Sequence, residues 1–187
     1  NFANGLLFCC DPYSKIINKD DKNTSLLFSD AATVTHLKSN NNEDRLKING
    51  FEFGKFLFAT KGIDGNALNN DTSKLYMDGR KIFNFAAKEV PIHVDQILSL
   101  TNRSVEDIDC FLFHQGSKAI LDYLQKKLMI SDAKVISNLA NSGNTVSSTI
   151  PLLLESVLND EDKKTLLLSG FGVGLSWASC ILERIGK

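Results

Sequence analysis

Long apolar runs, C-x-x-C cysteine pairs and an excess of one charge are all missing from this 187-residue sequence. No apolar stretch approaches the roughly 20 residues that a membrane-spanning helix needs, so we expect no membrane segment. The formal net charge is -1 and no dense block of like charge occurs, which argues against nucleic acid or an anionic membrane surface as a partner. What remains is an ordinary globular composition, with 43% hydrophobic and 23% charged residues, enough to bury a sizeable core.

The cysteine content is low and its spacing is uninformative for metal binding. The four cysteines, Cys9, Cys10, Cys110 and Cys180, form no C-x-x-C pair, so we expect neither a disulfide framework nor a metal site. Cys9 and Cys10 lie inside an apolar run, which favours buried free thiols. Free thiols fit a reducing compartment, and we therefore expect a cytoplasmic protein.

The sequence opens without the Met and lead-in of a natural start. Asn1 is followed within a few residues by the apolar run 6–10, a pattern typical of a strand. We therefore expect the chain to have been cut from a longer protein.

Apolar periodicity divides the chain into strands and helices. We expect strands at 6–10, 31–37, 51–59, 110–113, 134–137, 165–168 and 175–185, and helices at 78–100, 118–128 and 145–158. Pro91 is expected to interrupt the first helix, and Gly54 indicates a bulge in the third strand. Residues 38–44 are the clearest linker candidate, and residues 66–73 form a polar loop.

The order of these elements predicts the fold class. Strands and helices alternate after residue 110, which is typical of an α/β layer with helices covering a sheet. The last two strands are joined by the glycine-rich segment 170–174, which predicts a hairpin. We therefore expect a mixed β-sheet covered by helices, not a purely parallel one.

Two polar residues occupy matching places in successive strand–loop–helix units. His114 directly follows the expected strand 110–113, and Asn144 follows the next expected strand and precedes a helix. Open α/β sheets bind ligands at the carboxyl ends of their strands, so the two side chains are expected at the same edge of the sheet. Together they could donate two hydrogen bonds to a carbonyl oxygen that gains negative charge. The alternatives are a packed histidine and a helix N-cap asparagine.

The segment 170–174, Gly-Phe-Gly-Val-Gly, is the third candidate site. It lacks the G-x-G-x-x-G spacing, and a strand follows it where a dinucleotide-binding motif requires a helix. Its glycines could instead let backbone N–H groups approach a reacting carbonyl, or could simply form a tight turn. Lys126 and Lys127 lie on the helix after His114, where they form either a solvated face or a surface for an acidic carrier protein.

Five segments of the chain together resemble the β-ketoacyl-acyl-carrier-protein synthase III family. The strongest are DIDCFLFHQ at 107–115, SGNTVSSTIP at 142–151 and GFGVGLSW at 170–177, and the weaker are LFSDAA at 27–32 and MDGR at 77–80. The first two resemble the segments that carry the family's catalytic histidine and asparagine, at a matching separation. The third resembles its C-terminal glycine loop. A His–Asn pair separates this family from the elongating condensing enzymes, which use two histidines.

The resemblance implies a thiolase-like fold built from two similar α/β halves. Residues 1–40 would be the tail of the N-terminal half, and residues 41–187 the whole C-terminal half. It also implies decarboxylative condensation of an acyl group from coenzyme A with a malonyl-carrier thioester, in a homodimer and without a further cofactor. His114 and Asn144 would stabilise the enolate oxygen. Val173, between Gly172 and Gly174, would supply an oxyanion N–H, and Phe171 would lie near the acyl groups.

The resemblance also shows departures from the family. The nucleophilic cysteine is expected upstream of Asn1, and none of the four cysteines here can replace it, so the chain alone is expected to be inactive. Lys22 stands where the family has an arginine that stacks on the coenzyme A adenine, and Ser117 replaces a pantetheine-contacting asparagine. Ala119 replaces a carrier-docking arginine, whereas Lys126 and Lys127 match basic docking residues.

Two alternatives to condensation stay open on the sequence. The first is acyl transfer to a hydroxyl or amine, with His114 as the general base. The second is a non-catalytic domain for carrier docking or dimerisation. The retention of both His114 and Asn144 argues against the second, because packing requires neither residue.

Overall fold

Residues 4–39, 46–61, 68–69, 74–172 and 174–185 are described by the computed structural model. A seven-stranded sheet runs in the order β1-β2-β3-β4-β9-β8-β7. Its strands are β1 (Asn4–Asp11), β2 (Ala31–Ser39), β3 (Leu46–Ile48), β4 (Phe51–Thr60), β7 (Cys110–Phe113), β8 (Thr165–Gly172) and β9 (Ser176–Arg184). Among these strand pairs β7–β8 is parallel and the others are antiparallel, so the predicted mixed sheet is confirmed.

Helices and a small hairpin surround this sheet. The α-helices are α1 (Lys22–Ser25), α2 (Gly79–Leu100), α3 (Lys118–Lys127), α4 (Leu139–Ser142) and α5 (Thr149–Val157). The 3-10 turns are η1 (Tyr13–Lys15), η2 (Val105–Asp107), η3 (Asp132–Lys134) and η4 (Val146–Ser148), and the small hairpin pairs β5 (Leu68–Asn69) with β6 (Tyr76–Met77). In the described part of the chain, no helix is long and apolar enough to cross a bilayer.

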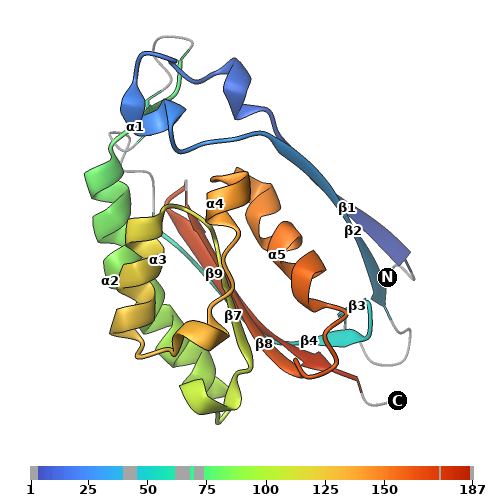
Figure 1. Ribbon diagram of the computed structural model, residues 1–187. Helices are drawn as coiled ribbons and strands as arrows, with labels where there is room; N and C mark the ends of the chain where they lie inside the picture. The colour runs from blue at the N-terminus through green and yellow to red at the C-terminus, as the bar shows by residue number, and fades with distance from the viewer. Residues whose placement is uncertain (1–3, 40–45, 62–67, 70–73, 173, 186–187) are drawn as a thin grey trace.

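The strand β7, the last in the sheet order, separates two hydrophobic layers. Its four residues are all buried, and successive side chains of a strand point to opposite faces. Phe111 and Phe113 pack with the layer of α2 and α3, whereas Cys110 and Leu112 pack with the layer of α5. Figure 1 shows α2 and α3 on one side of β7, β8 and β9, and α5 on the other side, between these strands and the β1–β2 hairpin.

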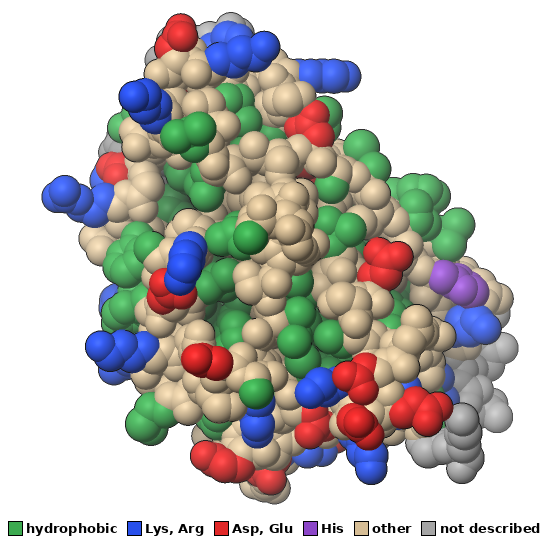
Figure 2. Space-filling view, viewed as in Figure 1, with side chains coloured by type: hydrophobic (Ala, Val, Ile, Leu, Met, Phe, Trp, Pro, Cys, Tyr) green, Lys and Arg blue, Asp and Glu red, His purple; other side chains and the backbone are tan. Residues whose placement is uncertain are grey.

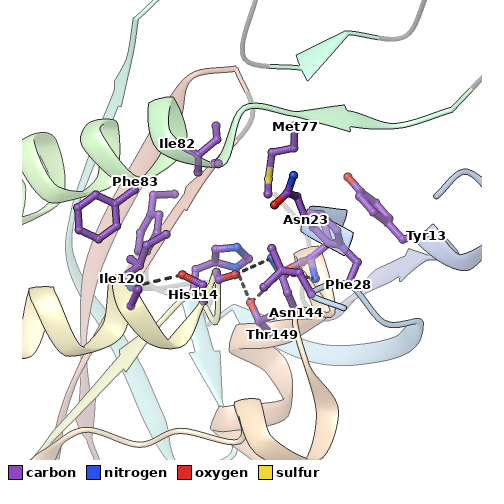
Figure 3. Close-up of a pocket in the computed structure, with 18 of the residues that line it drawn as sticks. Tyr13, Asn23, Phe28, Met77, Ile82, Phe83, His114, Ile120, Asn144 and Thr149 are labelled. Atoms are coloured by element: carbon purple, nitrogen blue, oxygen red, sulfur yellow. Dashed lines mark hydrogen bonds between the residues drawn. The ribbon is translucent and has the colours of Figure 1, made fainter. Parts of the chain in front are cut away.

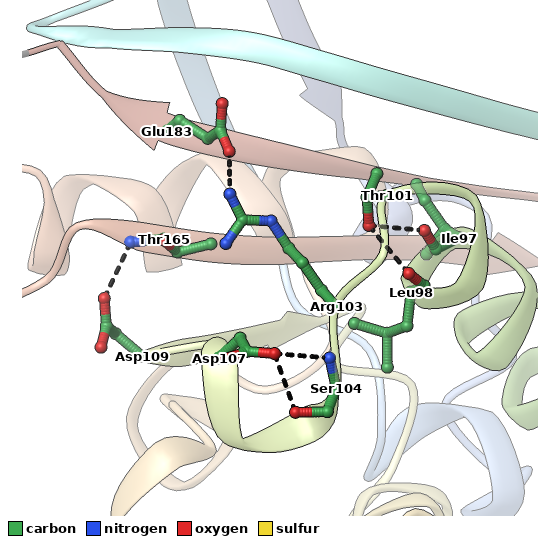
Figure 4. Close-up of polar contacts among 9 residues, drawn as sticks. All are labelled: Ile97, Leu98, Thr101, Arg103, Ser104, Asp107, Asp109, Thr165 and Glu183. Carbon is green, nitrogen blue, oxygen red and sulfur yellow. Dashed lines mark hydrogen bonds and ion pairs between the residues drawn. The ribbon is translucent and has the colours of Figure 1, made fainter.

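Polar contacts fix where β7 begins against β8. Asp109 accepts backbone N–H bonds from Lys164 and Thr165, at 2.9 and 2.8 Å, directly before the two strands pair. Arg103, after the end of α2, forms an ion pair with Glu183 of β9 (Figure 4). These contacts set the register of β7, and with it the place of the residue that follows the strand.

The bulge predicted at Gly54 is confirmed. The pairing of β4 with β9 shifts register between Phe53 and Phe56. A Cβ on Gly54 would lie 3.1 Å from the carbonyl oxygen of Ile181, so the close approach of the two backbones at this point suits glycine.

The predicted interruption at Pro91 is wrong. The helix α2 runs without a break from Gly79 to Leu100 with Pro91 inside it. A proline removes one backbone hydrogen bond and strains the turn before it. Val90, Val94 and Ile97 are fully buried on either side of Pro91, so the packing of this face outweighs the local cost.

The strand predicted at 134–137 is also wrong. The segment contains the end of η3 and a single bridge between Val135 and Phe111. Side-chain bonds hold its ends in place of a ladder: Lys134 Nζ donates to the Glu106 carbonyl at 2.8 Å, and Ser137 Oγ donates to Gln115 Oε1 at 2.9 Å.

The prediction of buried thiols in the first strand is wrong for Cys10, which is exposed. It is only partly right for Cys9, which is half-buried. An apolar run suits a strand covered on both faces, but β1 is an edge strand whose hairpin packs on η4 and α5 with one face only. On the other face Phe8 lies opposite Val34, and the two side chains are 67% and 56% exposed. Figure 2 shows hydrophobic side chains gathered along the edge where the hairpin lies.

Most of the predicted linker 38–44 and of the polar loop 66–73 lies outside the described residues. The division into 1–40 and 41–187 therefore stays a prediction. The two parts meet in the sheet through two residue pairs between β2 and β3, Lys38–Lys47 and Ser39–Leu46.

The core assignment can be tested on β7. Leu112 is fully buried, so Leu112→Ala should lower the free energy of unfolding by about 2–5 kcal/mol through lost burial and a residual cavity. Leu26 is 82% exposed, and Leu26→Ala should change it by less than about 0.5 kcal/mol. Urea denaturation of both variants measures the difference, and equal losses would contradict the assignment.

Candidate active site

A cavity of about 1040 Å³ lies at the carboxyl ends of β7 and β8. Figure 3 shows its floor, where His114, Asn144 and Thr149 converge, and its walls, with Ile82, Phe83 and Ile120 on one side and Tyr13, Phe28 and Met77 on the other. Of the predicted site residues, six line this cavity: His114, Ser117, Asn144, Gly170, Phe171 and Gly172.

His114 is positioned by the strand before it and by two neighbouring side chains. Its backbone N–H donates to the Ser169 carbonyl at 2.9 Å, which continues the β7–β8 ladder by one residue. Its Nδ1 lies 2.7 Å from Thr149 Oγ1, and its ring meets the edge of Phe171 at 5.4 Å between centroids. Burial lowers the pKa of His114 to about 4, so the imidazole is neutral at pH 7.

Asn144 is 4% exposed, and both its backbone and its side chain form hydrogen bonds. Its backbone N–H donates to the Leu27 carbonyl and its own carbonyl accepts from Ser29 N–H, both at 3.0 Å. Its Oδ1 accepts from the N–H of Val146 at 2.9 Å, and its Nδ2 donates to the Gly116 carbonyl at 3.3 Å. The second amide hydrogen of Asn144 has no acceptor among the described residues.

The loop around Asn144 has the backbone that this arrangement requires. Gly143 has a φ of +63°, and a Cβ there would lie 2.8 Å from Ser29 Oγ and 3.2 Å from the Leu27 carbonyl oxygen. The next turn, η4, is tied to the end of β1 because Ser147 N–H donates to Asp11 Oδ2 at 3.1 Å. Because of its positive φ and the close approach of segment 27–29, position 143 requires glycine.

The helix predicted at 145–158 begins later than expected. Asn144 is not its N-cap: its side chain bonds Val146, whose φ of +54° lies outside the helical range. The turn η4 follows, and α5 begins at Thr149. A local side chain–backbone bond thus competes with the helix, as short polar side chains often do.

The predicted glycine segment only partly forms the cavity wall. β8 extends to Gly172, so Phe171 and Gly172 are strand residues that line the cavity. Gly174 has a φ of +142°, which suits glycine, but it does not line the cavity. Val173 lies outside the described residues.

The residues predicted to bind coenzyme A and the carrier do not all line the cavity. Ser117 caps α3, accepting from Ile120 N–H at 3.3 Å, and lines the cavity. Lys22 is exposed on α1, directly before Asn23, which lines the cavity. Lys126 and Lys127 are exposed in the last turn of α3, roughly 15 Å along the helix from Ser117, and do not line it.

None of the cysteines lines the cavity. Burial raises the pKa of the Cys110 thiol to about 11 and that of Cys180 to about 12, which makes both poor nucleophiles. Cys9 and Cys10 lie on the outer hairpin. In the part of the chain that the structure describes, no group of three or more His, Cys, Asp or Glu side chains could hold a metal ion.

Sequence reasoning missed Thr149 and most of the cavity wall. The wall side chains Tyr13, Phe28, Met77, Ile82 and Phe83 come from segments far apart in the chain, and no local pattern indicates that they meet. Thr149 lay inside a stretch predicted as ordinary helix. The only available signal was a hydroxyl five residues after Asn144, which is weak alone.

Two family models match the chain. Residues 98–184 match "3-Oxoacyl-[acyl-carrier-protein (ACP)] synthase III C terminal", and residues 1–55 match "3-Oxoacyl-[acyl-carrier-protein (ACP)] synthase III". The "Beta-ketoacyl-[acyl-carrier-protein] synthase III" of Lactococcus lactis is 31% identical over 194 residues, which cover 97% of this chain and 60% of that protein. The protein of the same name from Prochlorococcus marinus is 31% identical over 198 residues, with 98% and 59% covered.

Solved structures give the same result. A 3-oxoacyl-(acyl-carrier protein) synthase from Burkholderia xenovorans has a TM-score of 0.85 at 33% identity, covering 98% of this chain and 56% of that one. The synthase III from Pseudomonas aeruginosa has a TM-score of 0.86 at 26% identity, covering 98% and 59%. These matches confirm the predicted thiolase-like fold. The chain spans about 60% of the length of the curated relatives that it matches.

The buried state of His114 predicts an acid-sensitive term in stability. Burial lowers its pKa from 6.5 to about 4, so between these pH values the unfolded chain binds more protons. This contribution is fully present above pH 6.5 and is lost as the pH falls toward 4. His114→Asn should make the unfolding free energy less dependent on pH in this window, by up to about 1.4 kcal/mol per pH unit.

Urea denaturation across this pH range measures the effect, because the carboxylates titrate equally in both proteins and cancel in the comparison. A His114→Asn variant that keeps the wild-type slope would show that His114 is not desolvated.

Proposed function

The chain belongs to the 3-oxoacyl-[acyl-carrier-protein] synthase III family, and on that premise we propose that it forms the C-terminal part of an acyl-thioester condensing enzyme. Residues 41–187 form the C-terminal thiolase-like half, and residues 1–40 the tail of the N-terminal half. The observation that supports this role most directly is the convergence of His114 and Asn144 in one cavity, each with a polar group not engaged by the described residues.

In the proposed reaction a malonyl thioester binds with its carbonyl oxygen between these two side chains. The bond to the carboxylate breaks, carbon dioxide leaves, and the electron pair moves onto the carbonyl oxygen as an enolate. Hydrogen bonds from His114 and from the second amide hydrogen of Asn144 stabilise that oxygen, most strongly in a buried cavity. The enolate carbon then attacks an acyl-cysteine thioester, the thiolate leaves, and a β-ketoacyl product forms.

The substrates of this reaction are coenzyme A and phosphopantetheine thioesters, and no further cofactor is needed. Ser117 lines the cavity and Lys22 lies beside it, which supports contacts to the pantetheine arm and the nucleotide. The exposed Lys126 and Lys127 offer positive charge to an acidic carrier protein such as malonyl-ACP. We also propose a homodimer for the whole protein, and a cytoplasmic setting that suits the four free thiols of this chain.

The first test concerns this chain alone. Because no cysteine lines the cavity, incubation with acetyl-coenzyme A should yield no stable acyl-enzyme. Intact-mass spectrometry should show the unmodified chain after prolonged incubation. Stoichiometric acylation of any of the four cysteines would contradict the proposal that the nucleophile lies outside this chain.

The second test uses the full-length protein. His114→Ala should reduce decarboxylation of a malonyl thioester by about 100-fold or more, because one of two donors to the enolate is lost. Acylation of the nucleophilic cysteine should remain measurable by mass spectrometry. His36→Ala, on the exposed face of β2, is the matched control and should retain full activity.

The outcomes of this experiment separate the alternatives. Intact decarboxylation with lost acylation would overturn the role assigned to His114. Transfer to a hydroxyl or amine acceptor that depends on His114, without decarboxylation, would favour the general-base alternative. A wild-type protein that neither acylates nor decarboxylates would favour the docking domain.

A further inference from the structure

One buried hydroxyl, that of Thr149, contacts the candidate catalytic histidine at its Nδ1. Thr149 is 3% exposed, and its Oγ1 lies 2.7 Å from His114 Nδ1 and 2.9 Å from the carbonyl oxygen of Val146. A hydroxyl carries one proton, so it can donate to only one of these two acceptors at a time. The choice decides which nitrogen of the neutral imidazole carries the ring proton.

The surroundings favour donation to His114. The Val146 carbonyl already accepts the backbone N–H of Thr149, so it does not need the hydroxyl proton as well. A separation of 2.7 Å is short for an N–H donor to oxygen, for which about 2.9–3.0 Å is usual, and fits a hydroxyl donor better. Both points favour Nδ1 as the acceptor, which leaves the ring proton on Nε2.

Nε2 is the nitrogen that is left accessible from the cavity. No hydrogen bond among the described residues engages His114 Nε2. Nε2 is also not a buried atom without a partner, because Thr145 Oγ1 is the only such side-chain nitrogen or oxygen in the described part of the chain. Phe171 packs against the imidazole edge-on, with 5.4 Å between the ring centroids.

We propose that Thr149 is a positioning residue that donates its hydroxyl proton to Nδ1 of His114 and thereby keeps the Nε2–H tautomer directed into the cavity. Nε2–H can donate to a thioester carbonyl oxygen, whereas the opposite tautomer presents a lone pair that repels it. The use of this tautomer rests on the proposed function, but the tautomer itself is a property of the free chain and is measurable without substrate.

Nitrogen NMR on the chain labelled with 15N-histidine provides the first test. The sequence has three histidines, and His114→Asn identifies the signals of His114. At pH 7 the wild-type protein should show His114 with the proton on Nε2. Thr149→Ser, which keeps the hydroxyl, should preserve that pattern, whereas Thr149→Val, which has the same shape without it, should shift at least half of the population to Nδ1–H.

The buried pair of His93 and Ser179 supplies a matched control. His93 Nδ1 lies 3.0 Å from Ser179 Oγ, a similar contact outside the cavity. Ser179→Ala should alter the signals of His93 and leave those of His114 unchanged. A wild-type His114 with its proton on Nδ1, or a Thr149→Val spectrum identical to the wild type, would overturn the proposal.

Kinetics in the full-length protein supply the second test. Thr149→Val should lower kcat for malonyl-coenzyme A decarboxylation by about 10- to 100-fold with KM nearly unchanged, and Thr149→Ser should stay within about twofold of the wild type. Equal losses in both variants would show that the hydroxyl is irrelevant and would overturn the positioning role. If the NMR result holds but His114→Ala still decarboxylates, then the proposed function fails while the tautomer assignment stands.

Discussion

The pairing of Asn144 with the segment 27–29 is the constraint on which the candidate site depends. Two backbone hydrogen bonds, to Leu27 and from Ser29, join parts of the chain more than a hundred residues apart. The hydroxyl of Ser29 adds a bond to the Ser142 carbonyl, and Gly143 leaves the room that Ser29 occupies. Asn144 lies between two short helical turns and not in a strand. These bonds therefore hold Asn144 in place, as the β7–β8 ladder holds His114.

The two candidate catalytic side chains are therefore held by different means. His114 follows a buried parallel strand whose register is set by Asp109, so its backbone position is determined by the core. Asn144 is held by loop contacts and by its own side-chain bonds to Val146 and Gly116. Desolvation lowers the pKa of His114 and keeps it neutral, and donors in a low-dielectric site stabilise developing charge more strongly than donors in water.

The sequence predicted the elements whose pattern is local. The burial of 110–113 and of 166–168 follows directly from apolar runs, and the polar residue that follows the first run lines the cavity as expected. The failures arose where distant contacts outweigh local preference: Pro91 inside a packed helix, and residues 134–137 held by side chains. The contact of Thr149 with His114 was beyond prediction, because it joins an ordinary helix residue to a histidine 35 positions away.

The β1–β2 hairpin links the stability of the fold to the geometry of the site. Its outer face exposes apolar side chains, so burial on that face contributes little, and the inner contacts with η4 must hold it. Those contacts include Ser148 Oγ to the Cys9 carbonyl at 3.2 Å and Ser147 to Asp11 at 3.1 Å. Because Ser147 and Ser148 lie between Asn144 and Thr149, fraying of the hairpin would loosen both the asparagine loop and the hydroxyl beside His114.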